Sequence, residues 1–340
     1  MRSERDFVRW LQQRAAQTRS DILLGIGDDA AILTPPPNRQ LVVMSDALVE
    51  DVHFRRRYVP AEAVGHKALA ANLSDCAAMG ATPRCCLLSL AIPSDAHAFA
   101  EGVVNGLLAL ADRTQVALVG GDTIASPHGL FIAVTLIGDV APACAVTRAG
   151  ARPDDYLFVS GTLGAAAAAF RALEQGLTPP DAAARARFLF PEARLKLGRY
   201  LAERQLATAM IDLSDGLSVD LIRLCEASRV GAVLEAEALP VAPAAVAVAG
   251  DADGARQLAL DGGEDYELLF TVAPRQVPAV LDLRKALAAE GLLLTCIGRI
   301  TEGPTVALRL ADELRPLRAG GYDHFVQPDR EGKGVADSSA

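Results

Sequence analysis

The sequence predicts a two-domain protein of mixed α/β (α+β) class, and three observations lead to this expectation. The chain has 340 residues, of which 51% are hydrophobic, so it is long enough for two domains and can bury a sizeable core. Apolar runs typical of strands alternate with stretches of helical periodicity. A turn-rich stretch at 147–155 interrupts this alternation. We therefore expect an N-terminal domain over residues 1–145 and a C-terminal domain over residues 146–326.

The N-terminal half opens with a helical pattern, because Phe7, Trp10 and Leu11 recur at helical spacing. Pro60 suits the first turn of a later helix, and Gly80 suits the end of that helix. The expected elements, in order, are a helix over 3–17, a buried strand over 41–44 that ends at Ser45–Asp46, a helix over 60–79, a strand over 85–91, a helix over 95–113, and strands over 116–119 and 130–137.

The C-terminal half repeats the alternation of strands and helices. The expected strands cover 156–160, 232–236, 267–272 and 292–298, and the expected helices cover 163–175, 192–205 and 217–228. From residue 327 the chain is mostly polar and has no apolar run to bury in a core. We therefore expect 327–340 to be a disordered tail.

Composition narrows the class of function. A formal net charge of −9 and a pI near 5.1 argue against nucleic acid as a partner. No apolar run approaches the roughly 18 residues that a membrane helix needs, so we expect a cytoplasmic protein without membrane spans. The six cysteines form no C-x-x-C pair, which favours reduced thiols in the core. A small anionic substrate would require bound cations or a local cluster of basic side chains.

Aspartates recur at the ends of predicted strands, in glycine turns and on one helix. They are Asp28, Asp29, Asp46, Asp75, Asp122, Asp212 and Asp215. Two unit charges 4 Å apart at an effective dielectric of 20 repel by roughly 4 kcal/mol, so converging carboxylates demand cations. Aspartate oxygens with water are the ligands that Mg²⁺ prefers, and Mg²⁺ leaves positions open for substrate phosphates. Metal-assisted phosphoryl transfer is the chemistry that this pattern favours.

Nucleotide binding by two familiar loops is not expected. Residues 25–30 match a loose dinucleotide-binding pattern, but their two carboxylates stand where a pyrophosphate would meet backbone amides. The prolines at 35–37 also stop the helix that should follow such a loop. No G-x-x-x-x-G-K-[ST] motif occurs, so ATP would not be held by a P-loop lysine.

Several polar residues admit two interpretations. Asp215 either contributes to a phosphate site, together with the amides at the start of the helix at 217, or only caps that helix. Arg148 near the domain junction either binds phosphate in bidentate fashion or lies on the surface. His53 is more often structural in such a context, whereas the glycine-rich loop at 262–267 suits the delivery of Glu264 to a substrate.

Seven segments carry a more specific resemblance, and they occur in the order in which a known family has them. They are Gly25–Ala31, Ser45–Asp46 with Val52–Phe54, Lys67–Asp75 with Ala77–Gly80, Gly120–Thr123, Ile211–Gly216, Gly262–Leu268 and Gly321–Phe325. These segments resemble the motifs of thiamine-monophosphate kinases over roughly residues 5–325.

The resemblance implies a phosphoribosylaminoimidazole-synthetase-like fold, in which an N-terminal αβ domain pairs across a homodimer and a C-terminal αβ sandwich completes each subunit. It also implies direct, in-line transfer of the γ-phosphoryl group of ATP to thiamine monophosphate, giving thiamine diphosphate and ADP. Several Mg²⁺ ions would assist, and no catalytic side chain would be needed.

The resemblance further implies roles for individual residues. The magnesium ligands would be Asp29, Ser45, Asp46, Asp75, Asp122, Asp212 and Asp215. The ATP-binding residues would be Gly121, Asp122, Arg148 and Ser214, and the residues that contact thiamine monophosphate would be His53, Glu264 and Tyr322.

The chain departs from the family's common pattern at two of these segments. Met44 stands where a hydroxyl residue is frequent, and Tyr322 stands where tryptophan is frequent. Met44 can offer a metal only its backbone carbonyl, whereas Tyr322 can still pack on a ring. Neither change removes an aspartate.

Two alternatives stay open at this stage. Phosphoribosylaminoimidazole synthetase is the enzymatic alternative, since only residues 50–54 and 262–268 favour the thiamine enzyme. A non-catalytic nucleotide-binding dimer is the alternative from another class. Missing metal ligands would be its sign, and the aspartates are intact.

Overall fold

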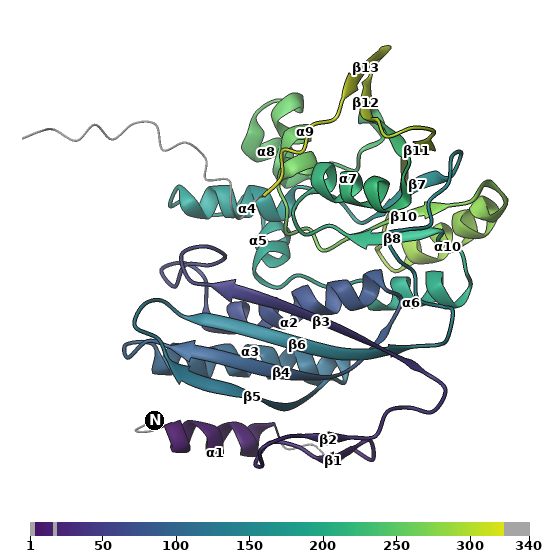
Figure 1. Cartoon of the computed structure of the whole chain (residues 1–340). Coiled ribbons are helices and arrows are strands. Elements are labelled where there is room, and N and C mark those ends of the chain that lie inside the picture. The colour runs from purple at the N-terminus through teal and green to yellow at the C-terminus, as the bar shows by residue number, and fades with distance from the viewer. Residues whose placement is uncertain (1–3, 16–18, 323–340) are drawn as a thin grey trace, which may run out of the picture.

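The computed structural model describes residues 4–15 and 19–322, so the predicted tail at 327–340 lies outside the described residues. Figure 1 shows two parts, each built on its own sheet: a four-stranded sheet in the N-terminal half and a seven-stranded sheet in the C-terminal half. Helices accompany both sheets, which confirms the predicted α/β class. Among the described residues, no helix is long and apolar enough to cross a membrane.

The N-terminal sheet has the order β3-β6-β4-β5. Its strands are β3 (Gln40–Val49), β4 (Thr82–Ile92), β5 (Ala117–Ala125) and β6 (Phe131–Val140), and its helices are α2 (Ala61–Ala78) and α3 (His97–Thr114). Both helices pack on one face of the sheet, where the alternate residues of β4 and β6 are buried (Figure 1). The remaining N-terminal elements are α1 (Glu4–Arg14), β1 (Ile22–Leu24) and β2 (Ile32–Leu33), which lie beside β5 (Figure 1).

Two helical glycines let α2 and α3 approach closely. A Cβ atom at Gly65 would overlap the backbone carbonyl of Val103, and one at Gly106 would overlap the backbone of Glu62. Because the obstacle is backbone and not a flexible side chain, a larger residue at either position would force the two helices apart.

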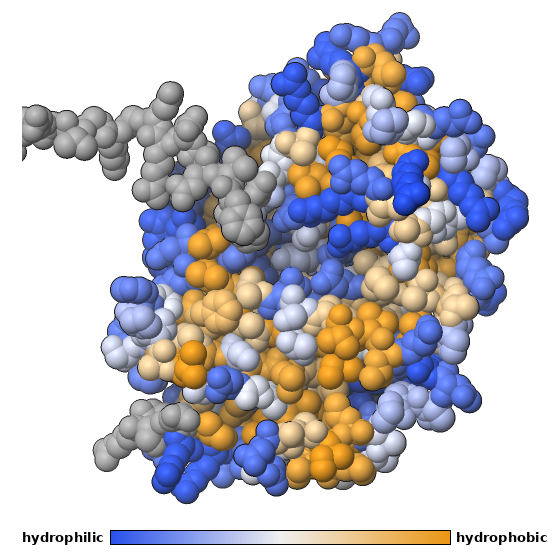
Figure 2. Space-filling view, in the orientation of Figure 1, coloured by the Kyte–Doolittle hydropathy of each residue, from blue (hydrophilic) through white to orange (hydrophobic). Residues whose placement is uncertain are grey.

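The opposite face of the N-terminal sheet carries exposed apolar side chains. In β3, Leu41 and Val43 are 55% and 62% exposed, and Ile124 of β5 is 56% exposed. Figure 2 shows this face as an apolar area over the lower half of the molecule. The prediction of a buried strand ending at Ser45–Asp46 is therefore wrong in two respects, since β3 continues to Val49 and only one of its faces packs against helices.

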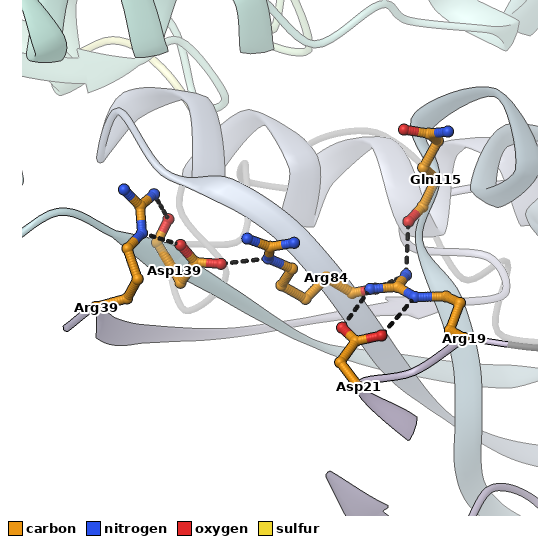
Figure 3. A network of polar contacts seen from close by, with 6 residues as sticks. All are labelled: Arg19, Asp21, Arg39, Arg84, Gln115 and Asp139. Carbon is orange, nitrogen blue, oxygen red and sulfur yellow. Dashed lines mark hydrogen bonds and ion pairs between the residues drawn. The ribbon is translucent and has the colours of Figure 1, made fainter. Parts of the chain in front are cut away.

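Beside this apolar face lies a network of ion pairs, drawn in Figure 3. Asp139 is fully buried and forms ion pairs with Arg39 and Arg84. Arg19 pairs with Asp21 at 2.6 Å and donates to the backbone carbonyl of Arg84 at 2.9 Å. These contacts neutralise a buried charge and fasten the N-terminal segment to β4.

The prediction of a strand at 116–119 followed by a glycine turn is also wrong in part. β5 continues through Gly120, Gly121 and Asp122 to Ala125 and pairs with β4 along that length. The sheet tolerates this because Gly121 has φ +148 and leaves room for the carbonyl of Leu88. Asp122 is consequently a residue within a strand.

The C-terminal sheet has the order β13-β12-β9-β11-β7-β10-β8. Its strands are β7 (Tyr156–Ser160), β8 (Ala209–Asp212), β9 (Gly231–Glu235), β10 (Leu268–Val272), β11 (Leu294–Thr301), β12 (Val306–Leu310) and β13 (Glu313–Pro316). The helices of this half are α4 (Ala165–Glu174), α5 (Ala182–Leu189), α6 (Leu195–Glu203), α7 (Leu217–Ser228), α8 (Pro243–Ala249), α9 (Ala252–Asp261) and α10 (Val277–Ala289). The sequence did not predict α5, α8, α9, α10, β8, β12 or β13.

Helix α2 also joins the two halves. Gly198 of α6 packs against it so closely that a Cβ atom there would overlap the carbonyl of Ala77. The end of α2 belongs to the same apolar cluster as Leu201 of α6 and Met210 of β8. The two sheets therefore meet around α2, and side chains from both reach the space beside it.

The close approach of α2 and α3 can be tested with Gly65→Ala. We expect this change to lower the free energy of unfolding by about 1–3 kcal/mol, because the added methyl group cannot fit without moving α3. Urea denaturation would measure the loss. Gly25→Ala is the control, since its Cβ would meet nothing nearer than 3.9 Å. Equal stabilities of the two variants would contradict the packing described here.

Candidate functional site

A cavity of about 320 Å³ lies between the two halves of the molecule. Its walls come from β3, α2, α4, the loop after β8 and the loop before β10. Eight of the predicted site residues line it: His53, Asp46, Asp75, Asp212, Ser214, Asp215, Glu264 and Tyr322. Residues separated by more than 250 positions in the sequence thus share one cavity.

Burial and repulsion between neighbouring carboxylates raise the pKa values of three aspartates in this cavity. Burial raises the pKa of Asp46. Burial, followed by repulsion from Asp212 and Asp46, raises the pKa of Asp75 to about 8, although the charge of Arg148 acts in the opposite direction. Burial also raises the pKa of Asp212 to about 6, despite a 2.7 Å hydrogen bond donated by Ser74. The cluster is therefore short of positive charge.

The nearby basic side chains are mostly engaged elsewhere. Arg223 pairs with Asp215 at 2.5 Å, and Lys67 pairs with Glu264 at 2.9 Å. Within residues 4–15 and 19–322, no lysine or arginine forms an ion pair with Asp46, Asp75 or Asp212, and Arg148 acts on Asp75 and Asp212 through its charge. Hard carboxylate oxygens with uncompensated charge are the donor set that suits Mg²⁺.

The carboxylates are not yet arranged as a closed coordination shell. No three His, Cys, Asp or Glu side chains of the described chain are positioned to hold one ion together. The donor types fit a magnesium site, and an arriving ion would have to draw the side chains of Asp46, Asp75 and Asp212 inward.

The loop after β8 is held by a residue that sequence reasoning missed. The buried carboxylate of Asp220 accepts hydrogen bonds from the backbone N–H groups of Ser214 and Asp215, both at 3.1 Å, and of Gly216 at 3.3 Å. Arg223 donates to the same carboxylate at 2.9 Å. These three amides before α7 are thus already occupied, so the phosphate site predicted here would have to use the amides of the helix itself, from Leu217 onward. The signal in the sequence was an aspartate in the first turn of the helix.

The loop before β10 is rigid for a different reason. Glu264 and Tyr266 have φ of +56° and +49°, a backbone region that residues with a side chain rarely adopt. Two hydrogen bonds hold this conformation, from the Glu264 N–H to the Ser214 carbonyl at 2.7 Å and from the Tyr266 N–H to the Leu213 carbonyl at 2.8 Å. The glutamate loop and the aspartate loop are therefore fixed to each other.

The outer part of the cavity is aromatic. Tyr322, 49% exposed, lines it, and its N–H donates to the carbonyl of Asp215 at 3.1 Å. Phe170 of α4, 39% exposed, lines it as well and was not predicted as a site residue. His53 accepts a hydrogen bond from the Val49 N–H at its Nδ1 atom, so its neutral form carries the proton on Nε2.

The remaining predicted residues do not line this cavity. Side chains alternate along a strand, so Ser45 and Asp46 lie on opposite faces of β3, and Ser45 hydrogen-bonds Thr135 on the outer face. Gly121 and Asp122 lie in β5, three strands from β3, or about 14 Å at about 4.8 Å per strand. Asp29 is an exposed residue of the segment that joins β1 to β2.

The role of Asp220 can be tested with Asp220→Asn. Removing a charged acceptor of several backbone amides costs about 1.5–3 kcal/mol per hydrogen bond, so the amides of residues 214–216 should exchange at least about tenfold faster with deuterium. Hydrogen-exchange mass spectrometry would measure this. Asp253→Asn, at an exposed residue that pairs with Arg256 along its own helix, is the matched control. Unchanged protection in Asp220→Asn would show that another group holds the loop.

Comparisons with known proteins agree with this geometry. Residues 27–140 match the family of AIR synthase related proteins by its N-terminal domain, and residues 152–311 match it by its C-terminal domain. A thiamine-monophosphate kinase of Synechococcus elongatus is 41% identical over 311 residues, which cover 88% of this chain and 91% of that protein.

Solved structures give the same result. The crystal structure of thiamine-monophosphate kinase from Stenotrophomonas maltophilia K279a has a TM-score of 0.78 and 43% identity, covering 89% of this chain and 94% of that one. A structure described as AaThiL complexed with AMPPCP and TMP has a TM-score of 0.71 and 30% identity, covering 93% of this chain and 98% of that one. Identity, coverage and fold together show that the chain belongs to the thiamine-monophosphate kinase family of AIR synthase related proteins.

Proposed function

We propose that this chain is a thiamine-monophosphate kinase, which transfers the γ-phosphoryl group of ATP to thiamine monophosphate and releases thiamine diphosphate and ADP. The observation that carries this proposal is the cavity between the two halves, which combines a carboxylate cluster short of positive charge with an aromatic, hydrogen-bonding wall. The relative whose structure is described as a complex with AMPPCP, an ATP analogue, and TMP supports both substrates.

Mg²⁺ is the cofactor that fits the carboxylate cluster, and Asp46, Asp75 and Asp212 would hold it, with Asp215 nearby. When bound, the ions would neutralise the phosphate oxygens during transfer. The protein's own contribution is to position these groups: the hydrogen bond from Ser74 favours the ionised form of Asp212, and Asp220 holds the following loop in place.

No general base is needed for the proposed reaction. The attacking group is an oxygen of a phosphate monoester, which is already anionic at neutral pH. His53 suits this acceptor because its Nε2–H group can donate to a phosphate oxygen. Phe170 and Tyr322 suit the rings of thiamine, and Arg148 adds positive charge close to the cluster.

The reaction is tested by incubating the purified chain with Mg·ATP and thiamine monophosphate and separating thiamine diphosphate by chromatography. Asp212→Asn should reduce kcat by at least about a hundredfold, because it removes charge from the proposed metal site, and EDTA should abolish turnover. Asp282→Asn, at an exposed helix position, should leave turnover unchanged. Near-normal turnover of Asp212→Asn would put the metal assignment in error.

A homodimer is the second part of the proposal. The exposed apolar side chains on the outer face of the N-terminal sheet, among them Leu41, Val43, Ile124 and Phe131, form an area that a second copy could cover. Of the predicted ligands outside the cavity, Ser45 lies on this face, Asp122 lies in the edge strand β5, and Asp29 lies in the segment between β1 and β2. Pairing of two such faces would bring these residues toward the partner's cavity, and ATP as co-substrate fits the cytoplasmic location expected from the sequence.

Mixing two inactive variants tests whether the site is shared. If Asp122 acts in the partner's cavity, dimers of one Asp122→Asn and one Asp212→Asn subunit contain one intact site. Random exchange should then restore roughly a quarter of wild-type activity. Mixtures without recovered activity would contradict sharing. Val43→Asp should prevent pairing, which sedimentation would detect as a monomer.

A further inference from the structure

Behind the wall of the cavity lies a buried lysine that the proposed reaction does not use directly. The side chain of Lys67 is 3% exposed, and its Nζ atom donates to both carboxylate oxygens of Glu264, at 2.9 and 3.0 Å. The ring of Phe188 lies on the other side, with its centroid 3.9 Å from Nζ. The ammonium group is thus enclosed between a carboxylate and an aromatic face.

Lys67 comes from the helix that also carries the carboxylate cluster. Lys67, Ala71 and Asp75 follow one another at intervals of four residues along α2, and the latter two line the cavity. Successive turns of one helix therefore supply the support for Glu264 and a member of the cluster. The spacing between these two parts of the site is fixed by α2.

The ion pair determines what Glu264 can recognise. Its side chain is 29% exposed and lines the cavity, while its charge is already balanced by Lys67. An ionised carboxylate has about four lone-pair positions, and the ammonium group uses two of them. The remaining positions can accept hydrogen bonds from a neutral N–H donor, but the pair as a whole offers little charge to a cationic ring.

We propose that Lys67 is a positioning residue that fixes Glu264 as a hydrogen-bond acceptor, so that this wall selects a substrate ring bearing an amino group. The proposal rests on the proposed function. In thiamine monophosphate the matching donor is the exocyclic amino group of the aminopyrimidine ring. The contacts that support it are the two-point ion pair, the enclosure by Phe188 and the backbone hydrogen bonds of Glu264.

A change of Glu264 to glutamine gives a directional test. The Lys67 ammonium group can only donate, so it would take the amide oxygen of the new side chain and turn the NH₂ group toward the cavity. The wall would then donate where the wild-type protein accepts. Glu264→Gln should therefore prefer the 4-oxo analogue, oxythiamine monophosphate, over the amino substrate.

The measured quantity is the ratio of kcat/KM for thiamine monophosphate to that for oxythiamine monophosphate. We expect the wild type to favour the amino substrate by at least about tenfold, and Glu264→Gln to reverse this preference, so that the ratio falls by at least about a hundredfold to below one. In the double variant Lys67→Met/Glu264→Gln the amide can turn freely, so the ratio should return toward one. Lys285→Met, at an exposed ion pair with Asp282, is the control and should keep the wild-type ratio.

The outcomes separate the inference from the function on which it rests. A wild-type protein that makes no thiamine diphosphate would overturn both. A wild-type protein that is active, with the same ratio in Glu264→Gln, would overturn the role of Glu264 and Lys67 alone. The same would follow if the double variant kept the ratio of Glu264→Gln. If Lys67→Met does not fold, Lys67→Gln replaces it in the double variant, because a glutamine at 67 can also accept and so releases the amide.

Discussion

Three carboxylates, those of Asp46, Asp75 and Asp212, share a cavity where burial and repulsion oppose their ionisation. This crowding is the constraint on which the rest of the site depends. Like charges at such a place persist only where hydrogen bonds or cations compensate them. Ser74 gives Asp212 one hydrogen bond, and Arg148 contributes charge at some distance. The remaining imbalance is what makes the cavity suitable for divalent cations and for the phosphates that they accompany.

Helix α2 holds the carboxylate cluster in place relative to the rest of the fold. This helix packs against α3 through Gly65, against α6 near Ala77 and against the cavity through Ala71 and Asp75. A shift of α2 would therefore move the carboxylate cluster, the support for Glu264 and the contact between the two halves together. Hydrogen bonds between residues 213–214 and 264–266 couple the two C-terminal loops in the same way.

Much of this could be predicted from the sequence where local signals were strong. Helix α7 was predicted at 217–228 and lies there, because a glycine precedes an apolar pattern of helical period. The grouping of Asp46, Asp75 and Asp212 followed from their motifs. Asp220 was missed because its partners are backbone amides, which leave no pattern in side-chain types beyond an aspartate in the first turn of a helix. Phe170 was missed because its helix is mostly alanine, and nothing local shows which face meets a cavity.

Other differences between the predictions and the structure arise from long-range contacts, which the order of residue types along the sequence does not show. Leu41 and Val43 have the apolar character of a buried strand, but no helix of the described chain covers their face. Asp122 follows two glycines, which usually signal a turn, yet pairing with β4 keeps this segment extended. In both cases long-range pairing in the sheet overrides the local preference.

The central claim is that the carboxylate cluster binds the divalent cations that assist phosphoryl transfer. Anomalous scattering from crystals grown with Mn²⁺ and a non-hydrolysable ATP analogue tests it most directly. The account predicts anomalous peaks within coordination distance of Asp46, Asp75 and Asp212. Bound nucleotide with no peak at these three side chains would contradict it.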